Sequence, residues 1–287
     1  LTDTSNPIKR IIIGIQFLFV AFGATVLVPL LIDIDPAVAL FTAGVGTLIF
    51  HIITKGKVPV FLGSSFAFIA PIIAATKIYG YPGTLGGIIA VGLVYGVVSA
   101  IIKLWGLRVI EKIFPAVVVG PVIMIIGLSL ASVGVDMAKT NWTIALIVLA
   151  TTIIIVSFTK GLIKLIPIFI GIIVGYIVSI IYGLIDFTLV NDAAWFALPK
   201  FTTPEFNWAA ILYMIPVAIA PIIEHVGDVY AIGGVCEKNF IEKPGLHRTL
   251  LGDGLATALA GFFGGVPNTT YSEVTGAIAL TKVTNPF

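Results

Sequence analysis

The chain has 287 residues, of which 59% are hydrophobic and only 10% charged, whereas a soluble domain carries about 25% charged residues. This composition excludes an ordinary soluble domain, and the net charge of +2 gives no reason to expect a nucleic-acid partner. A single cysteine, Cys236, excludes an internal disulfide and a cysteine metal cluster. We therefore expect a protein of the lipid bilayer, with no metal ion and no cofactor.

Eight apolar runs are long enough to cross a hydrocarbon core of about 30 Å as helices. They lie at about 11–32, 37–54, 83–102, 114–135, 142–158, 162–185, 209–236 and 248–263. Two shorter runs, 58–77 and 268–285, are interrupted by Pro, Gly, Ser and Thr. The sequence thus predicts an all-α polytopic membrane protein with ten spans.

The positions of the Lys and Arg residues predict the orientation, because basic loops stay on the cytoplasmic side. With a cytoplasmic N-terminus, 13 of the 16 basic residues lie inside, and only Lys77, Lys139 and Lys200 lie outside. This balance requires that both interrupted runs cross the membrane. We expect a multi-pass protein of the plasma or inner membrane with its N-terminus in the cytoplasm.

The two interrupted runs are related by an internal repeat with an offset of 208 residues. The offset aligns Gly44-Val45-Gly46 with Gly252-Asp253-Gly254, Gly56 with Gly264, Val58-Pro59 with Val266-Pro267, and Ser64 with Ser272. Glycine and proline set backbone shape, so these matches make the third and tenth spans counterparts. A repeat of seven spans is odd, and its second copy must therefore enter from the opposite face. The complete inverted repeat would have fourteen spans, about four more than this chain contains.

Both interrupted runs are expected to combine a short strand with a half-helix. In GGVPNTTYSEVTG, residues 264–276, the backbone should be extended from Pro267 to Thr270 and helical from about Ser272. Free backbone N–H groups would then lie at the start of the half-helix, beside Glu273. The stretch VPVFLGSSFAF should bring Gly63 to Phe66 to the same place. Inverted-repeat transporters bind their substrates where such interrupted helices meet.

Four acidic residues fall inside the spans: Glu224, Asp228, Asp253 and Glu273. A carboxylate at the bilayer centre costs about 2.5–3.5 kcal/mol on insertion scales, so it usually faces a polar interior and serves a function. Glu224 and Asp228 are four residues apart and share a helix face. We expect Asp253 to support the site from behind.

Three further residues are placed by their relation to these acids. The repeat pairs Glu224 with Gln16 and Glu273 with Ser65, and we expect Gln16 and Ser65 to support the site as well. His225 lies about 100° round the helix from Glu224 and is expected to pack in the core.

These groups favour a planar, neutral, imide-like ring as the ligand. Carboxylates accept N–H donors, free backbone amides donate to carbonyl oxygens, and the ring of Phe66 can cover a flat face. Several acids in one cavity would repel an anion. Sodium remains possible as the coupling ion, but a proton is simpler, and Asp228 or Glu224 is its expected carrier.

Four stretches, GATVLVPLL, FLGSSFAFIAP, EHVGD and FFGGVPNTTYSEVTGAIALTK, resemble the nucleobase–ascorbate transporter family, specifically its bacterial uracil permease branch. The resemblance covers the whole chain as the first ten of fourteen spans. The family signature is matched by Glu273, Gly276, Thr281 and Lys282.

The resemblance implies a core domain and a gate domain that shift against each other to move nucleobases with protons, often in homodimers. Residues 1–105 and 209–287 would form the core, and residues 106–208 the gate. Glu224 and Glu273 would hold the base and Phe66 would stack on it, while the backbone around Ala24, Tyr271 and Ser272 would complete the pocket. A glutamate at position 273 favours uracil over xanthine.

Three positions depart from the family pattern: Phe17 replaces the usual histidine, Val274 the motif asparagine, and Asp228 the histidine common in uracil permeases. Asp228 keeps a xanthine or purine-base symporter open as an alternative. An anion exchanger or channel of the same architecture is a weaker one, since it would need basic or neutral residues at positions 224 and 273. The chain has no HExxH or GxSxG motif, and we do not expect an enzyme.

Overall fold

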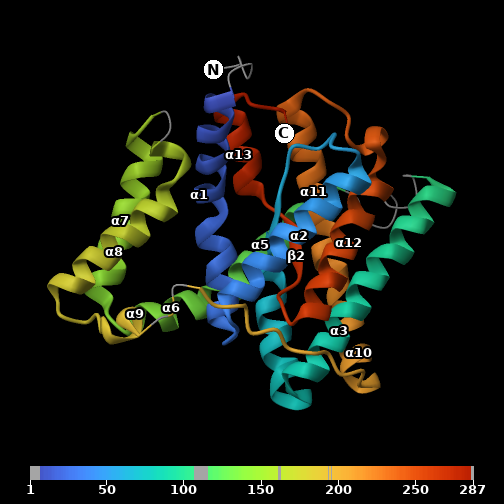
Figure 1. Ribbon diagram of the computed structural model, residues 1–287. Coiled ribbons are helices and arrows are strands. Elements are labelled where there is room, and N and C mark those ends of the chain that lie inside the picture. The colour runs from blue at the N-terminus through green and yellow to red at the C-terminus, as the bar shows by residue number, and fades with distance from the viewer. Residues whose placement is uncertain (1–6, 107–115, 161–162, 193, 195, 286–287) are drawn as a thin grey trace.

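The computed structural model describes residues 7–106, 116–160, 163–192, 194 and 196–285 (Figure 1). Most of the described chain is helical, which confirms the predicted fold class. The helices are α1 (Pro7–Leu31), α2 (Pro36–Thr54), α3 (Ile69–Trp105), α5 (Ala116–Ser129), α6 (Ala131–Lys139), α7 (Trp142–Phe158), α8 (Pro167–Ile181), α9 (Thr188–Asn191), α10 (Trp208–Met214), α11 (Ile219–Cys236), α12 (Leu246–Phe263) and α13 (Ser272–Thr281). Two strands, β1 (Leu62–Ser64) and β2 (Asn268–Thr270), and the short turns η1 (Phe66–Phe68), η2 (Ile163–Leu165), η3 (Ile215–Ala218) and η4 (Ile241–Gly245) complete the described elements.

Several helical segments of the described chain are long and apolar enough to span a bilayer. They are Gly14–Leu31, Pro36–Thr54, Phe66–Trp105, Gly120–Lys139 and Trp208–Cys236. Helices α7 and α8 are apolar as well but shorter. Each segment overlaps one or two of the predicted runs, whereas the total of ten spans and the inverted repeat stay predictions. The start of the predicted run 114–135, together with Arg108 and Lys112, lies outside the described residues.

The helices differ from the predicted spans at two places. One is the junction of the predicted third and fourth spans, and the other lies within the predicted run 209–236. The predicted third and fourth spans meet at Gly80, whose φ of 73° and ψ of 163° turn the chain sharply just before Pro82. Glycine adopts this backbone conformation without the steric cost of a Cβ atom. Within the predicted run 209–236, α10 ends at Met214, and the short turn η3, which contains Pro216, leads into α11.

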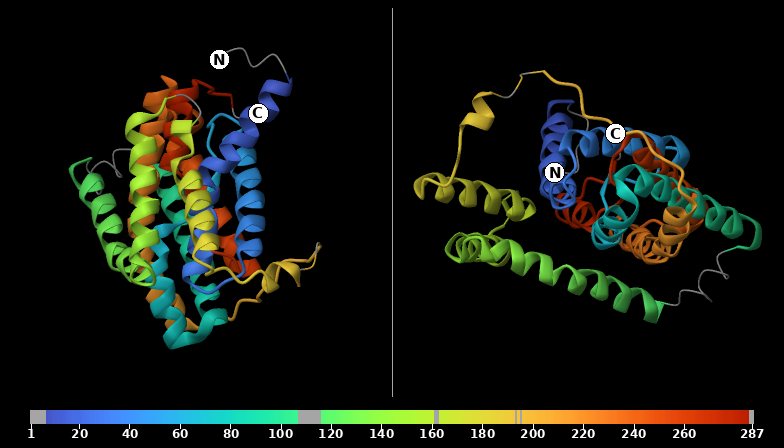
Figure 2. Two further views of the ribbon diagram at one scale, coloured as in Figure 1. Left: turned by 90° about the vertical axis from the view of Figure 1, so that its left-hand side faces the viewer. Right: turned by 90° about the horizontal axis from the view of Figure 1, so that it is seen from below.

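The centre of the bundle is built around α12, which packs closely against α3 and against α2 (Figures 1 and 2). Small residues permit this approach: a Cβ atom added to Gly92 of α3 would lie 2.5 Å from the carbonyl oxygen of Gly254 in α12. At Gly254 itself, an added Cβ would lie 2.4 Å from the Cβ of Tyr95. Helices in membranes associate through such small residues, because lipid supplies no hydrophobic force between them.

Strands β1 and β2 form an antiparallel pair inside the bundle, with Leu62 opposite Thr270 and Ser64 opposite Asn268. All residues of both strands are buried. Their mutual pairing satisfies backbone groups that lipid could not satisfy. Asn268 also anchors β2, because its Nδ2 donates to the carbonyl oxygens of Thr42 and Ala256 at 3.2 Å each. The predicted extended stretch before Ser272, and a helix beginning at Ser272, are both confirmed.

Helices α7 and α8 pack against each other and lie beside α1, away from α12 (Figure 1). Gly171 and Gly175 allow this contact, since an added Cβ atom would lie 2.6 Å from Thr152 Oγ1 at Gly171 and 2.7 Å from Val148 at Gly175. The rings of Phe19 in α1 and Phe169 in α8 are 4.6 Å apart, centroid to centroid. The chain between α3 and α10 thus contacts α1 through α8, and it contacts the rest of the bundle through α5, which packs against α11, and through Glu205, whose N–H donates to the carbonyl oxygen of Pro82 at 2.8 Å.

Candidate functional site

The four acids predicted from the sequence come together around α11. Helix α11 carries Glu224 and Asp228 and contacts β2, α12 and α13. Glu224 interacts electrostatically with Asp228, Asp253 and Glu273. Residues from three separate helices therefore form one acidic group beside the paired strands.

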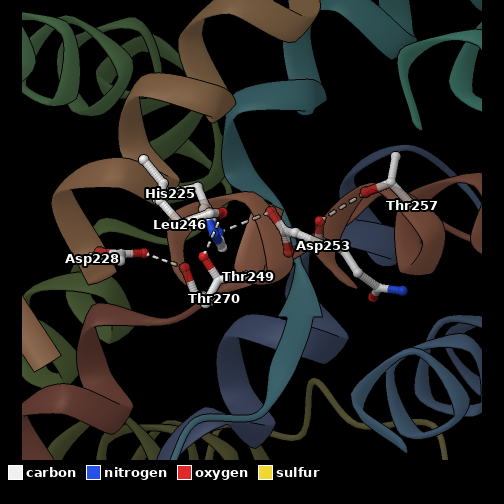
Figure 3. Close-up of polar contacts among 8 residues, drawn as sticks. His225, Asp228, Leu246, Thr249, Asp253, Thr257 and Thr270 are labelled. Carbon is white, nitrogen blue, oxygen red and sulfur yellow. Dashed lines mark hydrogen bonds and ion pairs between the residues drawn. The ribbon is translucent and has the colours of Figure 1, made fainter. Parts of the chain in front are cut away.

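Asp228 links α11 to the break between β2 and α13. Its Oδ2 accepts a hydrogen bond from Thr270 Oγ1 at 2.7 Å, as Figure 3 shows, and its Oδ1 accepts one from Ser272 Oγ at 2.8 Å. Thr270 is the last residue of β2, and Ser272 is the first of α13. Both carboxylate oxygens are thus engaged by hydroxyl donors on either side of the break.

The side chain of His225 in α11 packs in the core and also faces the carboxylate of Asp253 in α12. The two side chains are completely buried, and His225 Nδ1 lies 3.3 Å from Asp253 Oδ2 (Figure 3). Neither side chain has a hydrogen-bond partner of good geometry among the described residues. The expectation that His225 is a packing residue was therefore incomplete, because its ring also forms the polar neighbour of a buried acid.

Tyr271 connects the break to β1 and α1. Its hydroxyl donates to the carbonyl oxygen of Ser64 at 2.9 Å and lies 3.3 Å from Thr25 Oγ1. Ser64 Oγ in turn donates to the carbonyl oxygen of Thr25 at 2.9 Å. The ring lies against Gly63, where an added Cβ would be 2.5 Å from the ring carbon Cζ. The Tyr271 side chain is thus a structural clamp, and only its backbone remains for the predicted pocket.

Several predicted site residues have polar atoms without a protein partner. Glu224 Oε2, Ser65 Oγ and Gln16 Nε2 are buried, and none has a hydrogen-bond partner in the described part of the chain. Buried polar groups normally have partners, so these atoms are candidates to contact a ligand or water. Phe66 is half-buried in η1, and Ala24 is buried in α1.

Each half-helix begins without a side-chain cap. Neither Ser65, before η1, nor Tyr271, before α13, makes a side-chain hydrogen bond to the start of its helix. The first N–H groups of a helix lack partners within the helix, so two helix starts close to the strand pair present donors. This matches the donors expected at the interrupted runs.

Glu273 lies at the exposed edge of this acidic group. It is exposed and lines a cavity of about 180 Å³ together with Val20 of α1, Gly276 of α13 and Phe169 of α8. Lys164 of η2 lines the same cavity. Lys164 was not predicted from the sequence as a site residue, because a basic residue near the start of an apolar run indicates only the orientation of the span. Thr270 was not predicted either, because nothing distinguishes this residue from the rest of its strand.

Comparisons with known proteins agree with this description. A family model described as "Permease family" matches residues 8–287. A protein named "Probable uracil permease" from Haemophilus influenzae is 53% identical over 295 residues, which cover 100% of this chain and 71% of that protein. The "Uracil permease" of Bacillus caldolyticus is 45% identical, with 99% of this chain and 69% of that protein covered. The transmembrane domain of the cyanobacterial bicarbonate transporter BicA has a similar fold, with a TM-score of 0.65 at 15% identity over 96% of this chain and 79% of that chain.

Proposed function

Because the chain belongs to this permease family, the nucleobase–ascorbate transporters that its sequence resembles, we propose that it carries a nucleobase across the membrane and that the base is uracil. Family membership also means that the chain is a permease and not an enzyme. Relatives named as uracil permeases, at 45% and 53% identity, are the main support for the substrate. The acidic group supports a neutral ring with N–H donors and disfavours an anion.

In the proposed complex, Glu224 and Glu273 accept the N–H groups of the base, and Phe66 stacks on its face. The backbone of Ala24, Tyr271 and Ser272 completes the pocket, while Gln16, Ser65 and Asp253 support it. The unpartnered Oε2 of Glu224 and the uncapped helix starts favour this arrangement, because uracil has both N–H donors and carbonyl acceptors. Glu273, beside Phe169 of α8, would contact the base at the border with the moving part of the protein.

Transport is proposed to be coupled to protons through Asp228, with Glu224 as the second candidate. Both Asp228 oxygens accept hydrogen bonds from the hydroxyl groups of Thr270 and Ser272. A proton bound to one of these oxygens would turn that oxygen into a donor, and the facing hydroxyl would have to rotate and accept. Protonation of Asp228 would therefore change the hydrogen bonds at the break between β2 and α13, where the base is proposed to bind.

Alternating access is proposed to arise when a core of residues 1–105 and 209–287 moves against a gate of residues 106–208. Such a gate would slide along contacts with the core that include that of α8 with α1 and that of α5 with α11. The N-terminal end of α1 and the end of α13 lie at the same end of the bundle in Figure 1, and we place this end in the cytoplasm. The protein would reside in the plasma or inner membrane, and a homodimer is compatible with this arrangement.

A xanthine or purine-base symporter is the second candidate, because Asp228 stands where uracil permeases commonly have histidine. The bicarbonate transporter shares the fold alone, at 15% identity, and the acids of this chain disfavour a comparable anionic substrate.

The decisive experiment is uptake of labelled uracil by the intact protein in proteoliposomes, with and without an inward proton gradient. A sodium gradient is the matched control, and excess xanthine is the competitor. Uptake that needs the proton gradient and resists xanthine supports the proposal. Inhibition by xanthine would favour purine bases, uptake driven by sodium would overturn proton coupling, and the absence of uracil uptake would overturn the substrate.

A further inference from the structure

A second cavity, of about 640 Å³, lies at the end of the bundle where α2 and α11 end. We call it the lysine pocket, because Lys57, Lys238 and Lys243 line it together with Asn239, Glu242 and Thr284. None of the four acids of the candidate site lines this pocket. The two sites are therefore separate.

Among the residues that the structure describes, the lining of the lysine pocket has an excess of positive charge. The described lining contains three lysines and one acidic residue, Glu242. Within the described residues, the ion pairs are Lys139 with Asp136 and His225 with Asp253, so no pocket lysine lies within 4 Å of a carboxylate. Like charges in one cavity repel each other, and a bound anion would relieve this repulsion.

The three lysines come from two separate parts of the chain, and fixed turns hold them in place. Lys57 follows Lys55 and Gly56, which have φ angles of 56° and 58°. The backbone N–H of Lys238 donates to the carbonyl oxygen of Gly233 at 2.9 Å. Basic loops at the cytoplasmic end of a membrane protein explain why lysines occur here, but not why they line one cavity.

We propose that the lysine pocket binds a phosphate-bearing anion. Lysine is a common phosphate ligand, and basic pockets at the cytoplasmic ends of membrane helices bind the head groups of anionic lipids. All three lysines are exposed, so both a lipid head group and a dissolved phosphate can reach them.

The bound anion would hold together the ends of the segments that carry the candidate site. Lys57 leads into β1, Lys238 follows the end of α11 with Glu224 and Asp228, and Thr284 follows α13 with Glu273. The anion would thus stabilise the arrangement of these segments, whichever nucleobase is transported.

The test is the thermal stability of the intact, delipidated protein in detergent, with increasing phosphatidylglycerol, phosphatidylcholine or inorganic phosphate. The pocket variant carries Lys57→Gln, Lys238→Gln and Lys243→Gln. The matched control carries Lys55→Gln, Lys103→Gln and Lys160→Gln, which removes the same charge from exposed lysines outside the pocket.

Phosphatidylglycerol is expected to raise the melting temperature of the native protein and of the control variant, whereas phosphatidylcholine is not. In the pocket variant, the half-saturating concentration should rise at least about tenfold. A response to phosphatidylglycerol alone identifies a lipid head group, and an equal response to inorganic phosphate identifies a dissolved anion. The proposal is overturned if neither stabilises the native protein, or if the pocket variant responds as the control does.

Discussion

His225 Nδ1 lies 3.3 Å from Asp253 Oδ2, and both side chains have no exposed surface. This contact joins α11, which carries two of the candidate-site acids, to α12. A buried acid is costly unless a partner of opposite charge or a hydrogen-bond donor compensates for its lost hydration. The position of α11 against α12 therefore depends on the pairing of these two residues.

The first prediction concerns this buried pair. His225→Leu should lower the free energy of unfolding by about 3–5 kcal/mol, because it leaves Asp253 buried without its partner. The double variant His225→Leu and Asp253→Leu should recover much of this loss, since it removes both polar groups. The measurement is thermal or denaturant unfolding of purified protein in detergent. A single variant as stable as the native protein would show that the contact contributes nothing.

The second prediction tests the hydrogen bond from Thr270 to Asp228. Thr270→Val keeps the shape of the side chain but removes its hydroxyl, and a hydrogen bond to a charged group contributes about 1.5–3 kcal/mol. We expect weaker uracil binding and slower uptake. Thr151→Val is a matched control, because the Thr151 hydroxyl donates to the carbonyl oxygen of Ile147 within α7, outside the candidate site. Equal uptake by the two variants would contradict the role given to Thr270.

The third prediction concerns the close approach of Gly63 to Tyr271. In Gly63→Ala, the new Cβ would lie 2.5–2.6 Å from three atoms of the Tyr271 side chain, Cζ, Cε2 and Oη. The ring must then shift, which breaks its hydrogen bond to Ser64, and uptake should fall at least about tenfold. Gly44→Ala is the control, because an added Cβ there has no neighbour within 4 Å. If Gly63→Ala transports as well as Gly44→Ala, the packing of Tyr271 does not shape the site.

The fourth prediction separates binding from coupling. In Asp228→Asn, the amide can still accept from one hydroxyl and can donate to the other, so both contacts can be kept. The side chain can no longer bind and release a proton. Uracil should bind with an affinity within about threefold of the native value, while an inward proton gradient should no longer drive accumulation. Binding is measured by calorimetry and accumulation in proteoliposomes. A variant that still concentrates uracil would assign the proton to another group, and Glu224 is the next to test.

The fifth prediction concerns the choice of base. Glu273→Gln replaces a carboxylate oxygen by an N–H₂ donor, which mismatches an N–H of uracil. We expect uracil uptake to fall at least about tenfold, with a shift of preference toward xanthine. Glu205→Gln is the control, because it makes the same chemical change at an exposed residue that is not part of the candidate site. Uracil uptake and selectivity that remain native in Glu273→Gln would remove this residue from the pocket.

Local chemistry made a large part of this structure predictable. Long apolar runs predict spanning helices, because a helix satisfies all its backbone hydrogen bonds within itself. Pro267 and the residues that follow it indicated extended backbone before a helix at Ser272, and the structure has strand β2 and helix α13 in these places. The grouping of Glu224, Asp228, Asp253 and Glu273 was also foreseeable, because isolated acids in apolar spans must share a polar interior.

The sequence by itself therefore determined the membrane fold, the interrupted segments and the acids of the candidate site, all of which depend on periodicity and local backbone preference. Only the tertiary structure decided which atoms meet. Asp228 and Thr270 are 42 residues apart, and Tyr271 and Ser64 are 207 residues apart. Contacts at such separations depend on how each helix is rotated about its axis and how closely its glycines let it approach a neighbour. The rotation of α11 about its axis turns His225 toward Asp253, and the packing of the helix ends brings Lys57 close to Lys238 and Lys243. The packing of the whole bundle, and not any short stretch of sequence, fixes the direction of each of these side chains.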